Sequence, residues 1–199
     1  MALDHSCQVQ RHPHAVRGLD LYGTPPVAIP PLLAVENVPA CVLDPGAGRG
    51  NIALALRAAG RKVIAWDIAD YGFPLDQQCD FLSTPTMPTG CECILTNPPY
   101  KWVEAFILHA LELSPLVIML LRLAFFEAGS GKQQKHLLRR RVLDEIPPAR
   151  IHAFRKRLPM MHRDLWRGRK ANSGMAFAWW VWDRNHTGPI TIDRISWER

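Results

Sequence analysis

The 199-residue chain has no run of 18 or more apolar residues, which argues against a membrane-spanning helix. Its first ten residues lack the apolar stretch of a secretory signal, so we expect a cytoplasmic protein. The five cysteines are odd in number, and we expect them to be reduced thiols. The spacing of His5, Cys7, His12 and His14 fits no ordinary zinc pattern, so we expect no metal site. Internal repeats and low-complexity segments are also missing. The length suits one domain over residues 21–199, preceded by a polar, flexible tail over 1–20.

Positive charge is concentrated in one part of the chain. Thirteen Lys or Arg and three acidic residues lie between Lys132 and Lys170, and this local excess is larger than the net charge of +6 of the whole chain. The remainder is therefore net acidic. A basic excess confined to one part of a domain indicates a polyanionic partner, with a solvated helix face as the alternative.

Strand-like and helix-like segments alternate over the first two thirds of the chain. Short apolar strands are expected at 41–44, 62–67, 91–96 and 116–121, and helices after Thr24-Pro25 and at 51–59 and 101–113. This alternation predicts a parallel sheet with helices on both faces. Two later strand-like segments, 150–157 and 175–183, predict a terminal hairpin. We therefore expect an α/β fold with a Rossmann-like, doubly wound, mostly parallel sheet and an antiparallel C-terminal edge hairpin.

A glycine-rich turn, Asp44-Pro-Gly-Ala-Gly-Arg-Gly50, joins the first expected strand to its helix. Glycines let the backbone turn sharply and approach a ligand closely. The dinucleotide pattern G-x-G-x-x-G is incomplete, because Asn51 takes the place of the last glycine. The Asp44 carboxylate would repel a pyrophosphate but would pair with an ammonium group. The turn therefore favours S-adenosylmethionine, whose methionine end is cationic and which has no phosphate.

Acidic residues follow the next two expected strands. Asp67 ends the segment 62–67, where a carboxylate can accept both ribose hydroxyls of an adenosine, although a helix N-cap is the competing role. Asp80 and Phe81 stand near the end of the expected third strand, where they could bind an adenine amino group and cover its ring. A strand-end acid and a core phenylalanine are an equally good interpretation of that pair.

The sequence Asn97-Pro98-Pro99-Tyr100 directly follows an apolar strand. Each proline has a fixed φ and no N–H, and each holds the preceding residue extended. The resulting rigid turn would present the Pro98 carbonyl beside the Asn97 side-chain carbonyl. Two such acceptors suit an sp² amino group whose lone pair must be directed at a methyl sulfonium. Tyr100 would add a flat face on which a flipped base can stack.

These two turns resemble those of the amino-methyltransferases of nucleic acids, whose signatures are D-P-x-A-G-x-G and N/D/S-P-P-Y/F/W. Tyr22-Gly-Thr-Pro-Pro26 is similar to the segment that closes over the methionine moiety in these enzymes, and Ala178-Trp-Trp-Val-Trp182 to small phage or prophage DNA adenine methyltransferases. The resemblance covers about residues 20–197. It implies the class I methyltransferase fold, S-adenosyl-L-methionine as cofactor, and methylation of adenine N6 in DNA in a bacterial or phage-infected cytosol. Larger relatives append a recognition domain, so here segment 126–173 would supply any sequence preference.

The resemblance also implies the residues of the site. The catalytic turn would be Asn97, Pro98, Pro99 and Tyr100. The cofactor would be held by Thr24, Pro25, Asp44, Pro45, Gly46, Ala47, Gly48, Gly50, Asp67, Ile68, Asp80, Phe81 and Asn97. From the charge pattern, the nucleic-acid contacts are predicted to be Lys132, Lys135, Arg139, Arg140, Arg155, Arg157, Arg163, Arg167, Arg169 and Lys170.

Other functions stay open at this point. Methylation of RNA, at adenine N6 or guanine N2, uses the same kind of basic channel. Enzymes that modify a glutamine amide in a protein share the Asn-Pro-Pro-Tyr turn, but they usually carry a helical domain before the cofactor turn. A decayed methyltransferase that only binds nucleic acid is the non-enzymatic alternative. Methylation at C5 of cytosine would need a cysteine nucleophile, typically after proline, and the chain has no Pro-Cys pair.

Overall fold

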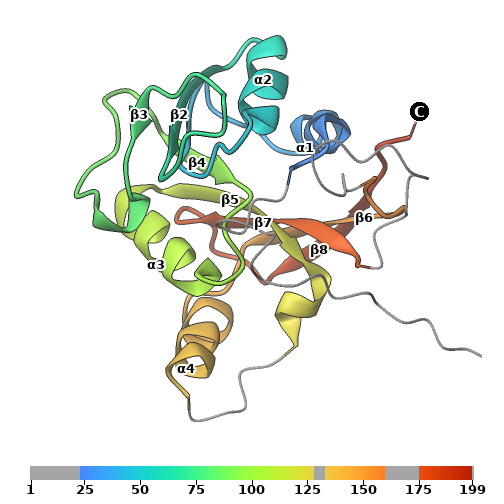
Figure 1. The fold of residues 1–199 in the computed structure, drawn as a ribbon. Coiled ribbons are helices and arrows are strands. Elements are labelled where there is room, and N and C mark those ends of the chain that lie inside the picture. Colours follow the sequence, from blue (N-terminus) through green and yellow to red (C-terminus); the bar gives the residue numbers. More distant parts are fainter. Residues whose placement is uncertain (1–22, 128–132, 160–174, 199) are drawn as a thin grey trace, which may run out of the picture.

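The computed structural model describes residues 23–127, 133–159 and 175–198, which form one eight-stranded sheet with helices on both faces. The strand order is β3-β2-β1-β4-β5-β7-β6-β8 (Figure 1). The strands are β1 (Cys41–Asp44), β2 (Lys62–Asp67), β3 (Gln77–Gln78), β4 (Cys93–Thr96), β5 (Leu116–Arg122), β6 (Arg150–Phe154), β7 (Phe177–Asp183) and β8 (Thr191–Ile195). The helices are α1 (Ile29–Leu33), α2 (Asn51–Ala58), α3 (Val103–Leu113) and α4 (Gln134–Arg140), with 3₁₀ turns at Pro26–Ala28, Phe81–Ser83 and Leu123–Phe126 and a π-helical turn at Arg141–Glu145.

The strand directions confirm the expected fold class. Strands β3, β2, β1, β4 and β5 are all parallel to one another. Strand β7 is antiparallel to both β5 and β6, so β6 runs in the same direction as β5. This is a Rossmann-like sheet, mostly parallel, whose C-terminal part is closed by the predicted antiparallel hairpin. Between β1 and β4 the chain reverses the direction in which it adds strands, and ligand sites in such sheets lie outside the carboxyl ends of the strands there.

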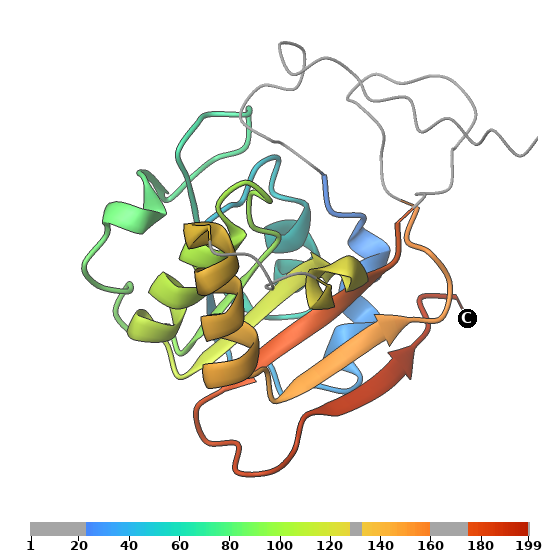
Figure 2. The ribbon, with the colours of Figure 1, turned by 90° about the horizontal axis from the view of Figure 1, so that it is seen from below.

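Two hydrophobic clusters, one on each face, hold the helices to the sheet. Figure 2 shows α1 and α2 behind the sheet and α3 and α4 in front of it. Alternation along β5 sends Ile118 and Leu120 to the cluster under α1 and α2, and Val117 and Met119 to the cluster under α3. A buried strand between two helical layers reads as a continuous apolar run, which is why the segment 116–121 was recognisable.

The tryptophans of β7 pack in the core, on the two faces between which a strand alternates. Trp179 belongs to the cluster under α1, and its indole N–H donates to the Ala28 carbonyl at 2.9 Å. Trp180 and Trp182 point to the opposite face and stack with ring centroids 6.3 Å apart. All three are at most 1% exposed, so they are structural and not a surface for stacking bases.

The structure differs from the expectations at several elements. The helix after Thr24 is only a 3₁₀ turn followed by the short α1, and the Thr24 side chain does not cap it. Strand β4 begins at Cys93, two residues later than expected, and strand β3 has only two residues. Helix α4 and edge strand β8 were not predicted. No helix of the described residues is long and apolar enough to cross a membrane, and the four cysteines among them are free thiols.

Candidate active site

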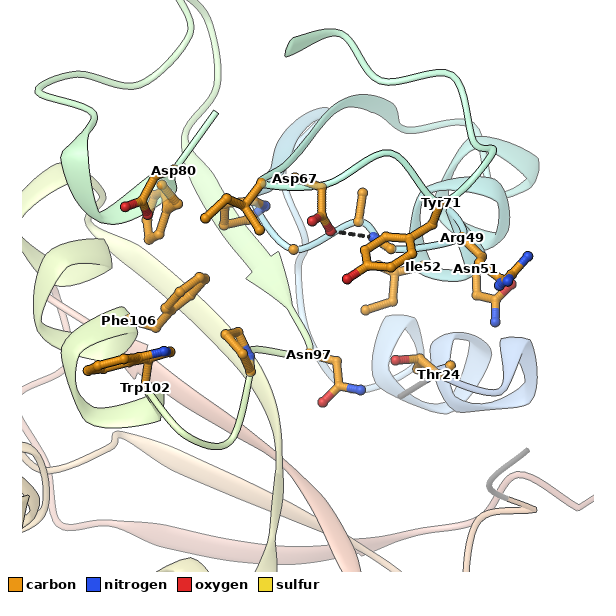
Figure 3. Close-up of a pocket in the computed structure, with 18 of the residues that line it drawn as sticks. Thr24, Arg49, Asn51, Ile52, Asp67, Tyr71, Asp80, Asn97, Trp102 and Phe106 are labelled. Atoms are coloured by element: carbon orange, nitrogen blue, oxygen red, sulfur yellow. Dashed lines mark hydrogen bonds between the residues drawn. The ribbon is translucent and has the colours of Figure 1, made fainter. Parts of the chain in front are cut away.

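A cavity of about 200 Å³ lies at the carboxyl ends of β1, β2 and β4 (Figure 3). It is where the strand order reverses, the position at which such folds bind ligands. The lining residues come from four places in the sequence: Gly23 and Thr24; Pro45, Gly46, Ala47, Gly48, Arg49, Asn51 and Ile52; Asp67, Ile68, Tyr71, Asp80, Phe81 and Leu82; and Asn97, Pro99, Trp102 and Phe106. The glycine turn and the Asn-Pro-Pro-Tyr turn, far apart in sequence, thus form walls of one cavity.

The glycine turn is shaped by positions that admit no side chain. Gly50 has a φ of +75°, and a Cβ there would lie 2.2 Å from the ring of Phe73. A Cβ on Gly46 would approach the Thr96 hydroxyl to 3.1 Å, beside the backbone of Asn97. Gly46 thus lets the turn after β1 pass closely by the end of β4. Gly50, by contrast, serves the packing of the turn and does not line the cavity.

Asp67 connects strand β2 to the glycine turn. Its Oδ2 accepts the backbone N–H of Gly48 at 2.8 Å, and its Oδ1 accepts that of Ala69 at 3.1 Å. The side chain lines the cavity and is only 7% exposed. Each carboxylate oxygen can accept a second hydrogen bond, so Asp67 keeps acceptor capacity for a ligand hydroxyl.

Asp44 lies behind the cavity wall and does not line it. The residue is fully buried; its Oδ1 accepts the Gly46 N–H at 3.4 Å, and its Oδ2 has no partner among the described residues. Burial raises the pKa of Asp44 to about 7, and the nearby Thr96 hydroxyl and Gly46 amide only partly oppose this shift. The Asp44 carboxylate was predicted to pair with a ligand ammonium, but in this structure it is not exposed to the cavity and cannot contact a ligand there.

The other end of the cavity is apolar. Trp102, which precedes α3, and Phe106, in its first turn, face Asp80 across the cavity in Figure 3. Ile68 and Trp102 are 54% and 53% exposed, unusual for large apolar side chains, and both line the cavity. The Asp80 carboxylate caps the turn at Phe81–Ser83 by accepting the Leu82 N–H at 3.0 Å. Phe81 is buried, so the structural roles considered for this pair hold, although both residues also line the cavity.

The turn after β4 places Asn97 at the cavity. Its residues 97–102 are closed by a hydrogen bond from the Trp102 N–H to the Pro99 carbonyl at 3.0 Å. The Tyr100 hydroxyl donates to the Asn97 Oδ1 at 3.2 Å. Asn97 and Pro99 line the cavity, whereas Pro98 is buried and Tyr100 packs against the cluster under α1.

Most of the predicted cofactor residues are brought together. The exceptions, which do not line the cavity, are Pro25, Asp44 and Gly50. Five lining residues were missed that carry polar or aromatic groups: Arg49, Asn51, Tyr71, Trp102 and Phe106. Arg49 and Asn51 adjoin the recognised glycine turn and could have been found by extending it. Tyr71, Trp102 and Phe106 have no sequence signal, because loops after β2 and β4 decide where they lie.

Arg139 does not project to solvent as a nucleic-acid contact would. Its guanidinium makes two hydrogen bonds to the Glu104 carboxylate, at 2.9 and 2.5 Å, and lies 4.0 Å from the ring centroid of Phe125. It also donates to the carbonyls of Phe125 and Glu127. These contacts occupy the guanidinium and fasten α4 to α3, so Arg139 has a structural role in place of the predicted nucleic-acid contact.

The remaining predicted basic contacts divide into two groups. Lys135, Arg140, Arg155 and Arg157 are exposed. Arg155 and Arg157 follow the carboxyl end of β6, which runs in the same direction as β5. They therefore lie at the same end of the sheet as the cavity. Lys132, Arg163, Arg167, Arg169 and Lys170 lie outside the described residues. Within the described residues, no group of three or more His, Cys, Asp or Glu could hold a metal ion.

Solved structures resemble the chain at low sequence identity. A Thermoplasma acidophilum protein is 21% identical over 77% of this chain and 85% of its own, with a TM-score of 0.46. A dimethyladenosine transferase from Plasmodium falciparum is 14% identical over 81% of this chain and 61% of its own, with a TM-score of 0.49. A TehB-like SAM-dependent methyltransferase from Corynebacterium glutamicum is 19% identical over 85% of this chain and 91% of its own, with a TM-score of 0.42. No family model and no curated protein sequence matches the chain. None of the three structures reaches a TM-score of 0.5.

Proposed function

We propose that the protein is an S-adenosylmethionine-dependent methyltransferase that acts on N6 of adenine in DNA. One observation carries the proposal. The side chain of Asn97, from the rigid turn after β4, lines the same cavity as the glycine turn and Asp67. An acceptor for an amino group would thereby lie beside the proposed site of an adenosine derivative.

The cavity has the chemistry that S-adenosylmethionine requires. The absence of side chains at Gly46 and Gly48 lets the ligand approach the backbone, and Asp67 offers an acceptor for ribose hydroxyls. The exposed apolar surfaces of Ile68 and Trp102 suit a flat adenine ring, which would remove them from water. Arg49, on the glycine turn, places a cation at the cavity for a carboxylate. When bound, the cofactor supplies a methyl group on a sulfonium cation.

The protein's part in the reaction is to hold and orient the target amino group. Asn97 Oδ1 and the Pro98 carbonyl would each accept one N–H of that group, which fixes its direction and draws its lone pair out of conjugation. The Tyr100 hydroxyl donates to the same Asn97 Oδ1 at 3.2 Å, and a carbonyl oxygen has two lone pairs. Transfer needs only such positioning and fixed dipoles, with no covalent enzyme intermediate.

Exposed basic residues at the same end of the sheet as the cavity favour nucleic acid over protein as substrate. Arg155 and Arg157 follow the carboxyl end of β6, and the cavity lies at the carboxyl ends of β1, β2 and β4, which run in the same direction. The charge of the two arginines suits a phosphate backbone. The salt dependence of DNA binding tests this role. Arg155→Ala should weaken binding and lower the slope of log K against log salt by about one. Lys62 is the first residue of β2 and lies at the opposite end of the strands, so Lys62→Ala should leave the slope unchanged.

The class of substrate is tested by transfer of a labelled methyl group from S-adenosylmethionine to double-stranded DNA, single-stranded DNA, RNA and a glutamine-containing protein extract. The proposal predicts label in DNA that is lost in Asn97→Ala and retained in Asn185→Ala. Asn185 follows β7 at the end of the sheet away from the cavity and is exposed, so it is a matched control. Label found only in RNA, or only in protein, would reject DNA as the substrate and identify the labelled class in its place. Cofactor binding without any transfer would indicate a decayed enzyme.

A further inference from the structure

Arg122, the last residue of β5, lies next to the proposed catalytic turn although nothing in its sequence context marks it. Its guanidinium is 4.4 Å from the ring centroid of Tyr100. In the sheet, Arg122 is paired with Phe177 of β7, whose ring centroid is 6.4 Å from that of Tyr100. Tyr100 is therefore in contact with both members of one cross-strand pair.

Strand alternation explains why Arg122 points to Tyr100. Leu120 of β5 belongs to the cluster under α1, and Arg122, two residues later, projects from the same face. Tyr100 packs against that same cluster. The position of the guanidinium is thus set by the rigid centre of the sheet, between β4 and β7, and not by a surface loop.

Among the described residues, the Arg122 guanidinium contacts the ring of Tyr100. Its Nε is buried and has no hydrogen-bond partner among the described residues. A guanidinium in that position is stabilised by the negative face of an aromatic ring, and its planar shape allows it to lie flat on the ring. The cation in turn restricts the rotation of the Tyr100 ring.

Tyr100 is hydrogen-bonded to Asn97, so a restricted Tyr100 ring also restricts the Asn97 side chain. The ring carries the hydroxyl that donates to Asn97 Oδ1 at 3.2 Å. An asparagine amide can rotate by half a turn, which exchanges its acceptor oxygen for a donor NH₂. The hydroxyl donor favours the orientation in which Oδ1 is presented as the acceptor that an amino substrate requires.

We infer that Arg122 is a positioning residue of the active site, which acts through Tyr100 to hold the Asn97 amide in its acceptor orientation. The inference rests on the proposed function, because Asn97 needs a fixed orientation only if it accepts a substrate amino group. Arg122 does not line the cavity, so it should not affect cofactor affinity.

Steady-state kinetics on the methylated DNA, in Arg122→Met, Tyr100→Phe and the double variant, provide the first test. Arg122→Met and Tyr100→Phe should each lower kcat about tenfold, with KM for DNA and Kd for S-adenosylmethionine within about twofold of wild type. The double variant should be no slower than the slower single variant, because both changes break the same chain of contacts. Arg122→Lys, which keeps a cation over the ring, should recover part of kcat. If Arg122→Met instead raised KM for DNA in a salt-dependent manner, and did so equally in the wild-type and Tyr100→Phe backgrounds, Arg122 would be a phosphate contact. That result would overturn the inference.

The second test needs no substrate. The side-chain amide ¹H–¹⁵N signals of Asn97, assigned by their loss in Asn97→Asp, should shift in Arg122→Met and in Tyr100→Phe. They should shift less in Arg122→Lys. Unchanged Asn97 signals in a folded Arg122→Met protein would overturn the inference even if the enzyme methylates DNA. Shifted signals in a protein that methylates no nucleic acid would uphold the coupling and reject the proposed function alone.

Discussion

The carboxylate of Asp67 accepts the backbone N–H of Gly48, 19 residues earlier in the chain, at 2.8 Å. This bond ties the end of β2 to the turn that follows β1, and so fixes the width of the cavity between two parallel strands. Asp67 therefore has two roles: its carboxylate holds the glycine turn in place, and it also lines the cavity where a ligand would bind.

The first prediction concerns this carboxylate. Asp67→Asn keeps an oxygen for the Gly48 N–H but removes the charge and half of the acceptor capacity. Hydrogen bonds to charged groups contribute about 1.5–3 kcal/mol, so affinity for S-adenosylmethionine should fall by about ten- to hundredfold in calorimetric titration. Asp144→Asn, an exposed change on the π-helical turn, serves as the control. Equal affinity in the Asp67 and Asp144 variants would remove Asp67 from the binding site.

The second prediction separates conformation from contact at two glycines with positive φ. Gly50→Ala would bring a Cβ to 2.2 Å from the Phe73 ring, whereas Gly90→Ala, at φ +83°, meets nothing within 4 Å. We expect the free energy of unfolding to fall by about 2–4 kcal/mol for Gly50→Ala and about 1 kcal/mol for Gly90→Ala. Denaturant unfolding of both variants measures this difference. Equal losses would show that the turn can move away from Phe73.

The third prediction follows from the raised pKa of Asp44, about 7 in the folded protein against 3.8 for the free side chain. Between these values the folded state holds a proton that the unfolded chain releases. The stability contributed by this proton is present below pH 4 and is lost as the pH rises to 7, by at most about 4 kcal/mol. The free energy of unfolding of wild type should therefore decline relative to Asp44→Asn across this window. A constant difference between the two proteins from pH 4 to 7 would contradict the pKa assignment.

The fourth prediction distinguishes two neighbouring arginines of α4. Arg139→Met leaves the Glu104 carboxylate, only 3% exposed, without its partner and should cost about 3–5 kcal/mol of stability. Arg140→Met changes an exposed residue and should alter stability by less than about 0.5 kcal/mol. Thermal or denaturant unfolding compares them directly. Similar stability of the two variants would mean that Arg139 does not fasten α4.

Much of the fold could be predicted because its strands are buried on both faces. Strands β1, β2 and β5 are apolar runs that each end in a charged residue, and their predicted bounds agree with the structure to within one residue. Edge strand β8 was missed because four of its five residues are exposed and show no apolar pattern. Helix α4 was missed because it has no side-chain cap and no buried residue.

The site was predictable where local sequence determines it. The two rigid turns could be found because glycine and proline act on their own backbone. The raised pKa of Asp44 could not, because it depends on burial in the folded protein, which the hydroxyl of Thr96 from another strand only partly opposes. The same holds for Arg122, whose proximity to Tyr100 depends on strand pairing, and for Trp102, whose exposure at the cavity depends on the turn that precedes α3.

Nucleoside analysis of methylated DNA tests the central claim most directly. DNA incubated with the protein and S-adenosylmethionine carrying a labelled methyl group would be digested and its nucleosides separated by mass. The account predicts N6-methyladenine as the labelled product with wild type and with Asn185→Ala, and its loss with Asn97→Ala. Label in another nucleoside, or N6-methyladenine that persists in Asn97→Ala, would contradict the role assigned to the turn at Asn97.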